Sequence, residues 1–220
     1  MRKSQKSISK VFKMKKNNFW KNKNIFITGI AGFVGSNLAK DLLNSGANVI
    51  GIDNRKKKIN SLFFFEKIDK KVNFFFGDVR NKKLLEKIFL KFDIQICFHL
   101  AAQVEVGSAN KYPYSTWDTN IRGTYTLMEV IRENKKKIKS IIVASSDKAY
   151  GKYPVNLLPY KENYKLNPEF PYDTSKACAD IIAKSYSSKL YKLPILITRF
   201  ANIYGPGQLN FTALIPDAIR

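Results

Sequence analysis

Six short apolar runs alternate with longer segments of mixed polarity from residue 24 onward. Runs that are this short and this uniformly apolar are typical of strands buried on both faces of a sheet. We therefore expect six buried strands. The runs are IFIT (25–28), NVIGI (48–52), VNFFF (72–76), IQICFHL (94–100), IKSIIVA (138–144) and PILITRF (194–200).

The segments between these runs carry apolar residues at helical spacing. In SNLAKDLLNSG (36–46), Leu38 and Leu42 stand four residues apart, and Gly46 follows as a residue that favours the end of a helix. Strands that alternate with helices in this way form a parallel sheet with helices on both faces. The sequence therefore predicts an α/β protein with a Rossmann-type, doubly wound parallel sheet.

The first run leads directly into the loop TGIAGFVG (28–35), in which glycines recur at every third position. Three glycines so placed between a strand and a helix allow a tight turn, a close approach of backbone N–H groups to a diphosphate, and close packing of the helix on the sheet. This context makes the glycine pattern a specific signal for a dinucleotide. The predicted cofactor contacts in the loop are Gly29, Gly32, Phe33, Val34 and Gly35.

The second run is followed directly by Asp53. A carboxylate at this point accepts hydrogen bonds from the ribose hydroxyls of NAD and repels the 2′-phosphate of NADP. The basic run from Arg55 to Lys58 favours the phosphate instead. We predict NAD as the cofactor and keep NADP as the alternative.

Tyr172 and Lys176 stand four residues apart at the start of a predicted helix. This spacing places both side chains on one face, so the ammonium group can stabilise the phenolate. An opposite charge within about 4–6 Å lowers a pKa by roughly one to three units. We therefore expect Lys176 to lower the pKa of Tyr172, which would make the tyrosine a base near neutral pH.

In their order along the chain, these motifs resemble those of the extended short-chain dehydrogenase/reductases that act on nucleotide sugars, the NAD-dependent epimerase/dehydratase family. The resemblance covers residues 18 to 220. The motifs that carry it are TGIAGFVGSNLA (28–39), Asp53, GDVR (77–80), HLAAQ (99–103), TNIRGT (119–124), SSDKAYG (145–151), PYDTSK (171–176) and RFANIYGPG (199–207).

The resemblance implies functions for further residues. Asp78 and Val79 would flank the adenine, and Ala101 would line the cofactor. Tyr172 and Lys176 would contact the nicotinamide ribose, with Tyr172 as the catalytic base. Asn120 would support Lys176 through a backbone or water contact. The implied substrate-binding residues are Gln103, Ser146 and Asn202.

The reaction depends on the steps after oxidation of the sugar at C4. Epimerases only return the hydride to the rotated keto sugar, whereas dehydratases also remove the C5 proton and expel the C6 hydroxyl. Ser146, Asp147 and Lys148 resemble the Ser-Asp-Lys of the CDP-glucose 4,6-dehydratases. Ser146 would then bind the C4 oxygen, and Asp147 would protonate the departing hydroxyl.

Lys148 has three interpretations: the base at C5, a cation that stabilises the C5 enolate, or a bystander. The function of the chain also has three interpretations. The chain is a nucleotide-sugar 4,6-dehydratase or its cofactor-binding half, a nucleotide-sugar 4-epimerase or reductase, or a noncatalytic NAD-binding module. The loop after Gly151 lacks the tryptophan-bearing insertion expected of the CDP-glucose enzymes. That difference leaves the nucleotide open.

We predict three parts of the chain: a basic disordered tail (1–23), an NAD-binding Rossmann domain with the catalytic residues (24–205), and the start of a truncated substrate-binding domain (206–220). The expected partners are a nucleoside-diphosphate sugar, a second chain that supplies the rest of the substrate domain, and a second copy of this chain. The second copy would pack through long helices at 115–134 and 172–191.

Composition changes this picture little. The 39 basic and 17 acidic residues give a net charge of +22, but the lysines are scattered among Asn, Ile and Phe, as in a composition biased toward lysine and asparagine. We therefore expect no nucleic-acid partner. Because no run reaches the roughly 18 apolar residues of a membrane span, we expect no membrane partner. Two reduced thiols, Cys97 and Cys178, favour the cytoplasm, and His99 is predicted to be structural, with no metal.

Overall fold

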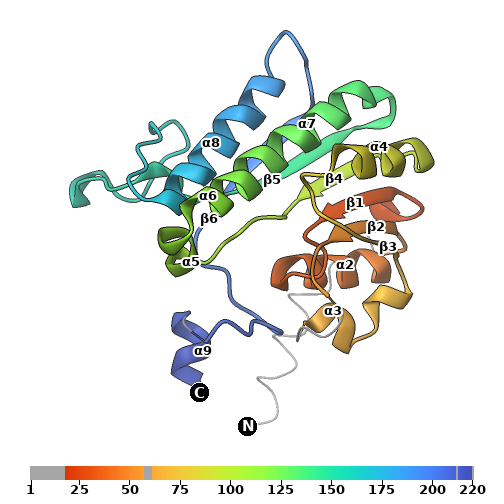
Figure 1. Ribbon diagram of the computed structural model, residues 1–220, viewed down its shortest axis with the longest axis horizontal. Helices are drawn as coiled ribbons and strands as arrows, with labels where there is room; N and C mark the ends of the chain where they lie inside the picture. The colour runs from red at the N-terminus through yellow and green to blue at the C-terminus, as the bar shows by residue number, and fades with distance from the viewer. Residues whose placement is uncertain (1–17, 57–60, 212, 220) are drawn as a thin grey trace, which may run out of the picture.

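The computed structural model describes residues 18–56, 61–211 and 213–219. Six strands and the helices between them follow in the predicted alternation (Figure 1). The strands are β1 (Asn24–Thr28), β2 (Asn48–Asp53), β3 (Asn73–Phe76), β4 (Ile96–His99), β5 (Ser140–Ser146) and β6 (Ile195–Phe200). The α-helices are α2 (Phe33–Asn44), α3 (Leu62–Phe65), α4 (Lys82–Lys91), α5 (Val106–Lys111), α6 (Pro113–Trp117), α7 (Gly123–Glu133), α8 (Pro171–Tyr186) and α9 (Leu214–Ile219).

All six strands pair in parallel, in the order β3-β2-β1-β4-β5-β6. The direction in which successive strands are added reverses between β1 and β4. The glycine loop after β1 and the segment after β4 therefore leave the sheet in opposite directions and open a crevice between them. In parallel α/β sheets, ligands bind at such a reversal point. The predicted doubly wound Rossmann-type sheet is confirmed.

Two apolar cores lie on the two faces of the sheet. One packs sheet residues such as Phe26 and Ile141 against α4, α7 and α8. The other packs Ile25 and Ile27 against α2 and α3. Because alternate strand residues point to opposite faces, the two cores use alternate positions of β1. Both cysteines are free thiols, as predicted, and Cys97 is fully buried.

The beginning of the fold differs from the predicted boundary at residue 24. Residues Asn18–Trp20 form a 3-10 helix, Trp20 packs against the α2 side of the core, and the Asn22 N–H donates to the Gly46 carbonyl at 2.8 Å. Residues 18–23 therefore belong to the folded domain. The rest of the predicted tail, residues 1–17, lies outside the described residues.

The two predicted long helices also differ in detail. The segment expected to be helical over 115–134 consists of α6, a π-helical turn (Asp118–Arg122) and α7. The second, expected over 172–191, ends at Tyr186. A π-turn inserts one residue into the helical repeat, and such turns are frequent at functional sites.

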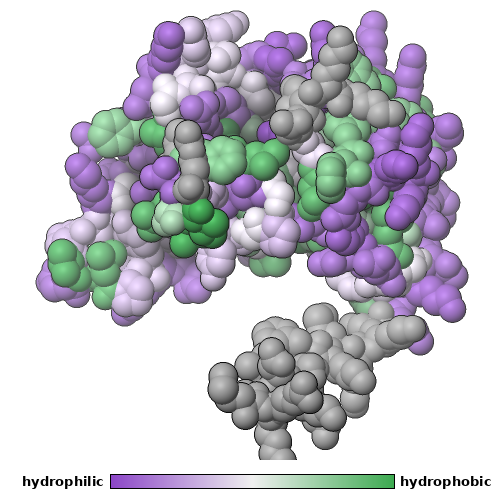
Figure 2. All heavy atoms as spheres, turned by 90° about the horizontal axis from the view of Figure 1, so that it is seen from below, coloured by the Kyte–Doolittle hydropathy of each residue, from purple (hydrophilic) through white to green (hydrophobic). Residues whose placement is uncertain are grey.

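Hydrophilic residues cover much of the face shown in Figure 2, and apolar residues form separate patches among them. Several exposed apolar residues belong to the segment after β6, among them Tyr204, Leu214 and Ile219. In the part of the chain that the structure describes, no helix is both long enough and apolar enough to cross a membrane.

His99 is buried at the end of β4, with each ring nitrogen bonded to a threonine hydroxyl. Nδ1 lies 2.8 Å from Thr28 Oγ1, and Nε2 lies 2.9 Å from Thr124 Oγ1. The histidine thus joins β1, β4 and α7, which is the structural position predicted for it. Burial, with a smaller effect of the Lys176 charge, lowers its pKa to about 3.

The buried His99 makes stability depend on acid pH. The folded-state pKa lies below the ordinary value of 6.5, so the unfolded chain binds more protons between about pH 3 and 6.5. We expect the free energy of unfolding to fall by about 2 kcal/mol from this group between pH 7 and pH 5. Urea denaturation at both pH values measures it. In His99→Gln the difference in the free energy of unfolding between pH 7 and pH 5 should be smaller by that amount. An equal difference in the wild type and the variant would contradict the prediction.

Candidate active site

The glycine loop leaves no room for side chains at two of its glycines. Gly29 has a φ of +72°, and a Cβ on it would lie 2.8 Å from the Ala101 backbone nitrogen. A Cβ on Gly35 would overlap the Gly29 carbonyl oxygen. Glycine is the residue that permits both a positive φ and so close a backbone approach. Gly32 precedes α2 directly and serves as its N-cap residue.

Asp53 holds this loop from the end of β2. Its Oδ2 accepts a hydrogen bond from the Ala31 N–H at 2.9 Å, and its Oδ1 accepts one from the Arg55 N–H at 2.8 Å. Burial raises the pKa of Asp53, while these backbone bonds and the Arg55 charge oppose the increase. The carboxylate therefore orients the loop in addition to lining the cleft beside it.

A cleft of about 480 Å³ opens above the loop. This volume is within the range of ligand sites, roughly 300–1,000 Å³. The cleft, its glycine-lined floor and the carboxylate at its side together fit an adenine dinucleotide. The predicted cofactor residues that line it are Gly29, Gly32, Phe33, Val34, Gly35, Asp53, Asp78, Val79 and Ala101.

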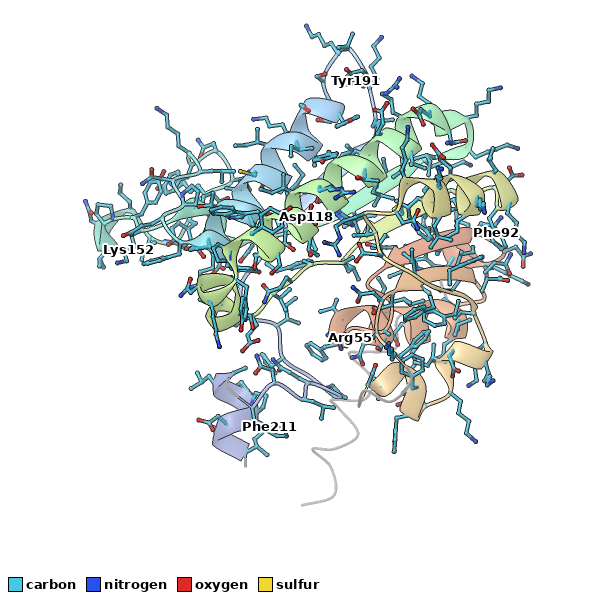
Figure 3. All side chains as sticks on the ribbon, in the orientation of Figure 1. Arg55, Phe92, Asp118, Lys152, Tyr191 and Phe211 are labelled. Atoms are coloured by element: carbon cyan, nitrogen blue, oxygen red, sulfur yellow. The ribbon has the colours of Figure 1, made fainter. Side chains whose placement is uncertain are left out.

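Asp78 is held in place by Arg80, which also pairs with Asp118 of the π-turn. The bonds from Arg80 lower the pKa of Asp78, with burial opposing them, so this carboxylate stays ionised. Asp118 is labelled near the centre of Figure 3, on the helical segment between α6 and α7. Arg80 thus joins the part of the cleft that Asp78 lines to the helical segment that also carries Asn120.

The segment after β5 brings three predicted catalytic residues into one tight turn. Ser146 ends the strand, and Asp147–Tyr150 forms a 3-10 helix. The Ser146 hydroxyl donates to Asp147 Oδ1 at 3.1 Å and accepts from the Lys148 N–H at 3.2 Å. The Lys148 side chain is exposed. Because strand residues alternate, the neighbouring Ser145 points elsewhere, and its buried hydroxyl has no partner among the described residues.

Tyr172, in the first turn of α8, lies beside this turn. Burial raises its pKa, and the charges of Asp147 and Asp173 add to the increase, while a hydrogen bond with Ser146 opposes it. The expectation that Lys176 lowers the pKa of Tyr172 is therefore wrong for this structure. The phenol is withdrawn from water, and two carboxylates lie near it, so its neutral form is favoured.

Lys176 is 6% exposed and points into the protein. Its Nζ donates to the Ala144 carbonyl at 2.6 Å, and burial lowers its pKa to about 8, opposed by the Asp180 charge. The bond to β5 explains why the ammonium does not control the tyrosine here. It also joins α8 to the strand that carries Ser146.

Asn120 connects two predicted site residues through its side chain. Its Oδ1 accepts from the Gln103 N–H at 2.7 Å, and its Nδ2 donates to the Gln103 carbonyl and, at 2.8 Å, to Ser175 Oγ. Ser175 in turn donates to the Tyr172 carbonyl at 2.6 Å. Asn120 thus secures the first turn of α8, while the implied support of Lys176 remains a prediction.

Two substrate-binding predictions have different positions. Gln103 is half-buried beside Asn120, and its Oε1 is buried without a partner among the described residues. Asn202 is exposed on the segment after β6 and is not among the residues that line the cleft.

Three residues near the site were not predicted from the sequence. Asp173 is 9% exposed, and burial raises its pKa, with the Lys148 charge opposing the increase. Arg199 and Asp180 form a buried ion pair at 2.8 Å, and Arg199 also donates to the hydroxyl of Tyr150 at 2.8 Å. The acidic residue inside PYDTSK was a visible signal, whereas the ion pair joins residues from separate elements.

Comparison with known proteins agrees with the geometry. The family model for GDP-mannose 4,6 dehydratase matches residues 26–220. The CDP-glucose 4,6-dehydratase of Salmonella typhimurium is 31% identical over 211 residues, which cover 92% of this chain and 58% of the relative. This chain therefore spans little more than half the length of that relative.

Solved structures give the same result. The dTDP-glucose 4,6-dehydratase DesIV from Streptomyces venezuelae, with NAD and TYD bound, superposes on this chain with a TM-score of 0.78 and 29% identity. The superposed region covers 88% of this chain and 60% of the DesIV chain. The UDP-glucose 4-epimerase of Thermotoga maritima, with UDP-glucose, has a TM-score of 0.75 and 29% identity and covers 84% and 57%. With the family model matched over nearly the whole sheet, the chain belongs to the GDP-mannose 4,6-dehydratase family, within the NAD-dependent epimerases and dehydratases of nucleotide sugars.

Proposed function

We propose that this chain binds NAD and carries the catalytic residues of a nucleotide-sugar 4,6-dehydratase. The observation that supports this most directly is the turn of Ser146, Asp147 and Lys148 beside Tyr172. In addition to the tyrosine, it provides a carboxyl group and an amine, and a dehydratase needs an acid and a base beyond the tyrosine. NAD, when bound, accepts the hydride from C4 of the sugar.

The tyrosine and the serine act first. Tyr172 takes the proton of the C4 hydroxyl, and Ser146, which shares a hydrogen bond with it, stabilises the C4 oxygen. The neutral phenol favoured by burial becomes a base only when positive charge reaches it. Lys176 supplies this charge by turning from the Ala144 carbonyl toward Tyr172.

Elimination of water then uses the turn. Once C4 is a carbonyl, the C5 proton is acidic. Lys148, as the free amine, takes this proton, and the enolate that forms expels the C6 hydroxyl. Asp147 donates the proton that converts the leaving group to water. The ammonium that Lys148 then carries stabilises the negative charge of the enolate. A proton returns from Lys148 to C5 as the hydride returns to C6, which gives the 4-keto-6-deoxy sugar.

A C4 epimerase is the second candidate, because the structural likeness to the UDP-glucose 4-epimerase is almost as high. It would use Tyr172, Lys176 and Ser146 alone. A noncatalytic NAD-binding module is the third. The domain limit between residues 205 and 206, the homodimer and the second chain that completes the substrate domain also remain predictions.

Isotope labelling separates these candidates. We expect the chain, given NAD and a series of nucleoside-diphosphate hexoses in deuterated water, to form a 4-keto-6-deoxy sugar with deuterium at C5. Mass spectrometry and NMR measure both. A C4-inverted sugar without the label would select the epimerase, and NAD binding without turnover of any substrate would leave the binding module.

A further inference from the structure

The segment that follows β6 crosses back over the dinucleotide cleft. In Figure 1 the chain leaves β6, runs toward α3 and then turns back to α9. We call residues 205–210 the strap. Four of them, Gly207 to Asn210, line the same cleft as the glycine loop and Asp53. The strap and the phosphate-binding loop therefore line one common cleft.

The strap is attached to both helices on that side of the sheet. Asn37 of α2 donates from Nδ2 to the Pro206 carbonyl at 3.0 Å. Gly207, with a φ of +80°, lies against α3, so that a Cβ on it would be 3.0 Å from the Leu62 Cβ. A glycine in the left-handed region is what permits this turn and this close contact.

The attachment to α3 places the strap at the Asp53 end of the cleft. Ser61, directly before α3, donates to the Ala31 carbonyl at 2.6 Å, and the Ala31 N–H donates to Asp53. Asp53, Ala31, Ser61 and the strap thus form one connected group. If Asp53 binds the ribose next to the adenine, as predicted from the sequence, this end of the cleft holds that ribose.

Gln208 is the strap residue with an unused polar atom. Its Oε1 is buried, and no hydrogen-bond partner for it exists among residues 18–56, 61–211 and 213–219. A buried acceptor without a partner costs about 1–3 kcal/mol. A carbonyl oxygen accepts hydrogen bonds but cannot donate them, so its ligand must bring an O–H or N–H group. A ribose hydroxyl has that chemistry, whereas a diphosphate oxygen does not.

We propose that Gln208, at the same end of the cleft as Asp53, binds a hydroxyl of the adenosine ribose. The strap then makes the segment after the last strand part of the cofactor site. This inference rests on the proposed binding of NAD, and it adds a residue outside the glycine loop to that site.

Calorimetry with NAD, ADP, 2′-deoxy-ADP and 3′-deoxy-ADP tests the proposal. Gln208→Met keeps a side chain of similar length and removes the acceptor. We expect it to weaken the binding of NAD and of ADP by the same factor, roughly five- to tenfold. One of the two deoxy nucleotides should bind the wild type and the variant equally, because it lacks the hydroxyl.

Two control variants separate the outcomes. Leu214→Ala, on the exposed face of α9, should leave every affinity unchanged. Asp53→Arg should abolish binding of NAD. If Gln208→Met binds NAD as the wild type does, or loses affinity equally for all four ligands, the assignment of Gln208 is overturned while NAD binding stands. A wild type that binds no NAD would overturn both.

Discussion

Arg199→Met is expected to lower the free energy of unfolding by about 3–5 kcal/mol, the usual cost of removing one partner of a buried ion pair. Asp180 is only 1% exposed and receives two hydrogen bonds from the guanidinium. Without Arg199 the Asp180 carboxylate would remain buried and lose both hydrogen bonds, with only the charge of Lys176 near it. Urea denaturation followed by tryptophan fluorescence measures the loss.

Two variants test the cause of that loss. Arg199→Met combined with Asp180→Leu removes both charges and should be more stable than Arg199→Met alone, because the Asp180 charge is no longer left buried without its arginine partner. Arg132→Met removes a pair with Glu129 in which both side chains are about one-third exposed, and it should cost less than about 1 kcal/mol. An Arg199→Met protein within 1 kcal/mol of the wild type would contradict the prediction.

Asp147→Asn is expected to slow dehydration by at least about 100-fold, the lower range for loss of a general acid. The amide introduced by this substitution would occupy the same place beside Ser146 but could not protonate the C6 hydroxyl. Oxidation at C4 does not use this carboxyl group. The variant should therefore still transfer hydride, and NADH should accumulate, since the later step that consumes it is blocked.

NADH absorbance and product analysis measure the two steps separately. Lys148→Met is the matched comparison, because it changes the adjacent residue of the same turn. If Lys148 stabilises the enolate as a cation, Lys148→Met should also slow elimination. The amount of NADH that accumulates in this variant should be no larger than in Asp147→Asn. Dehydration by Asp147→Asn at the wild-type rate would contradict the role of Asp147.

The sheet and the glycine loop were predictable because their signals are local. Each buried strand is a continuous apolar run, and even β4, predicted at 94–100, differs from the observed Ile96–His99 by only three residues in total. The glycines of the loop are determined by contacts with their own neighbours, such as Gly35 with Gly29. A window of about ten residues is enough to recognise patterns of this kind.

The electrostatics of the site were not predictable from spacing. The four-residue interval between Tyr172 and Lys176 indicates their shared helix face but says nothing of Ala144, which bonds the lysine from another element. Burial and the two carboxylates near Tyr172 depend on the packing of α8 against the turn after β5. The π-turn at Asp118 and the contact of Gln208 with the cleft likewise depend on distant parts of the chain.

The alternation of Ser145 and Ser146 has a consequence for how homologous genes are interpreted. One hydroxyl reaches Asp147, and the other is buried without a partner among the described residues, so the strand direction alone decides which serine is functional. Loss or gain of a single codon within β5 would exchange the two faces. Such a gene would still encode every residue of the motif, yet its product would place the other serine at the position where the proposed function puts the C4 oxygen of the sugar.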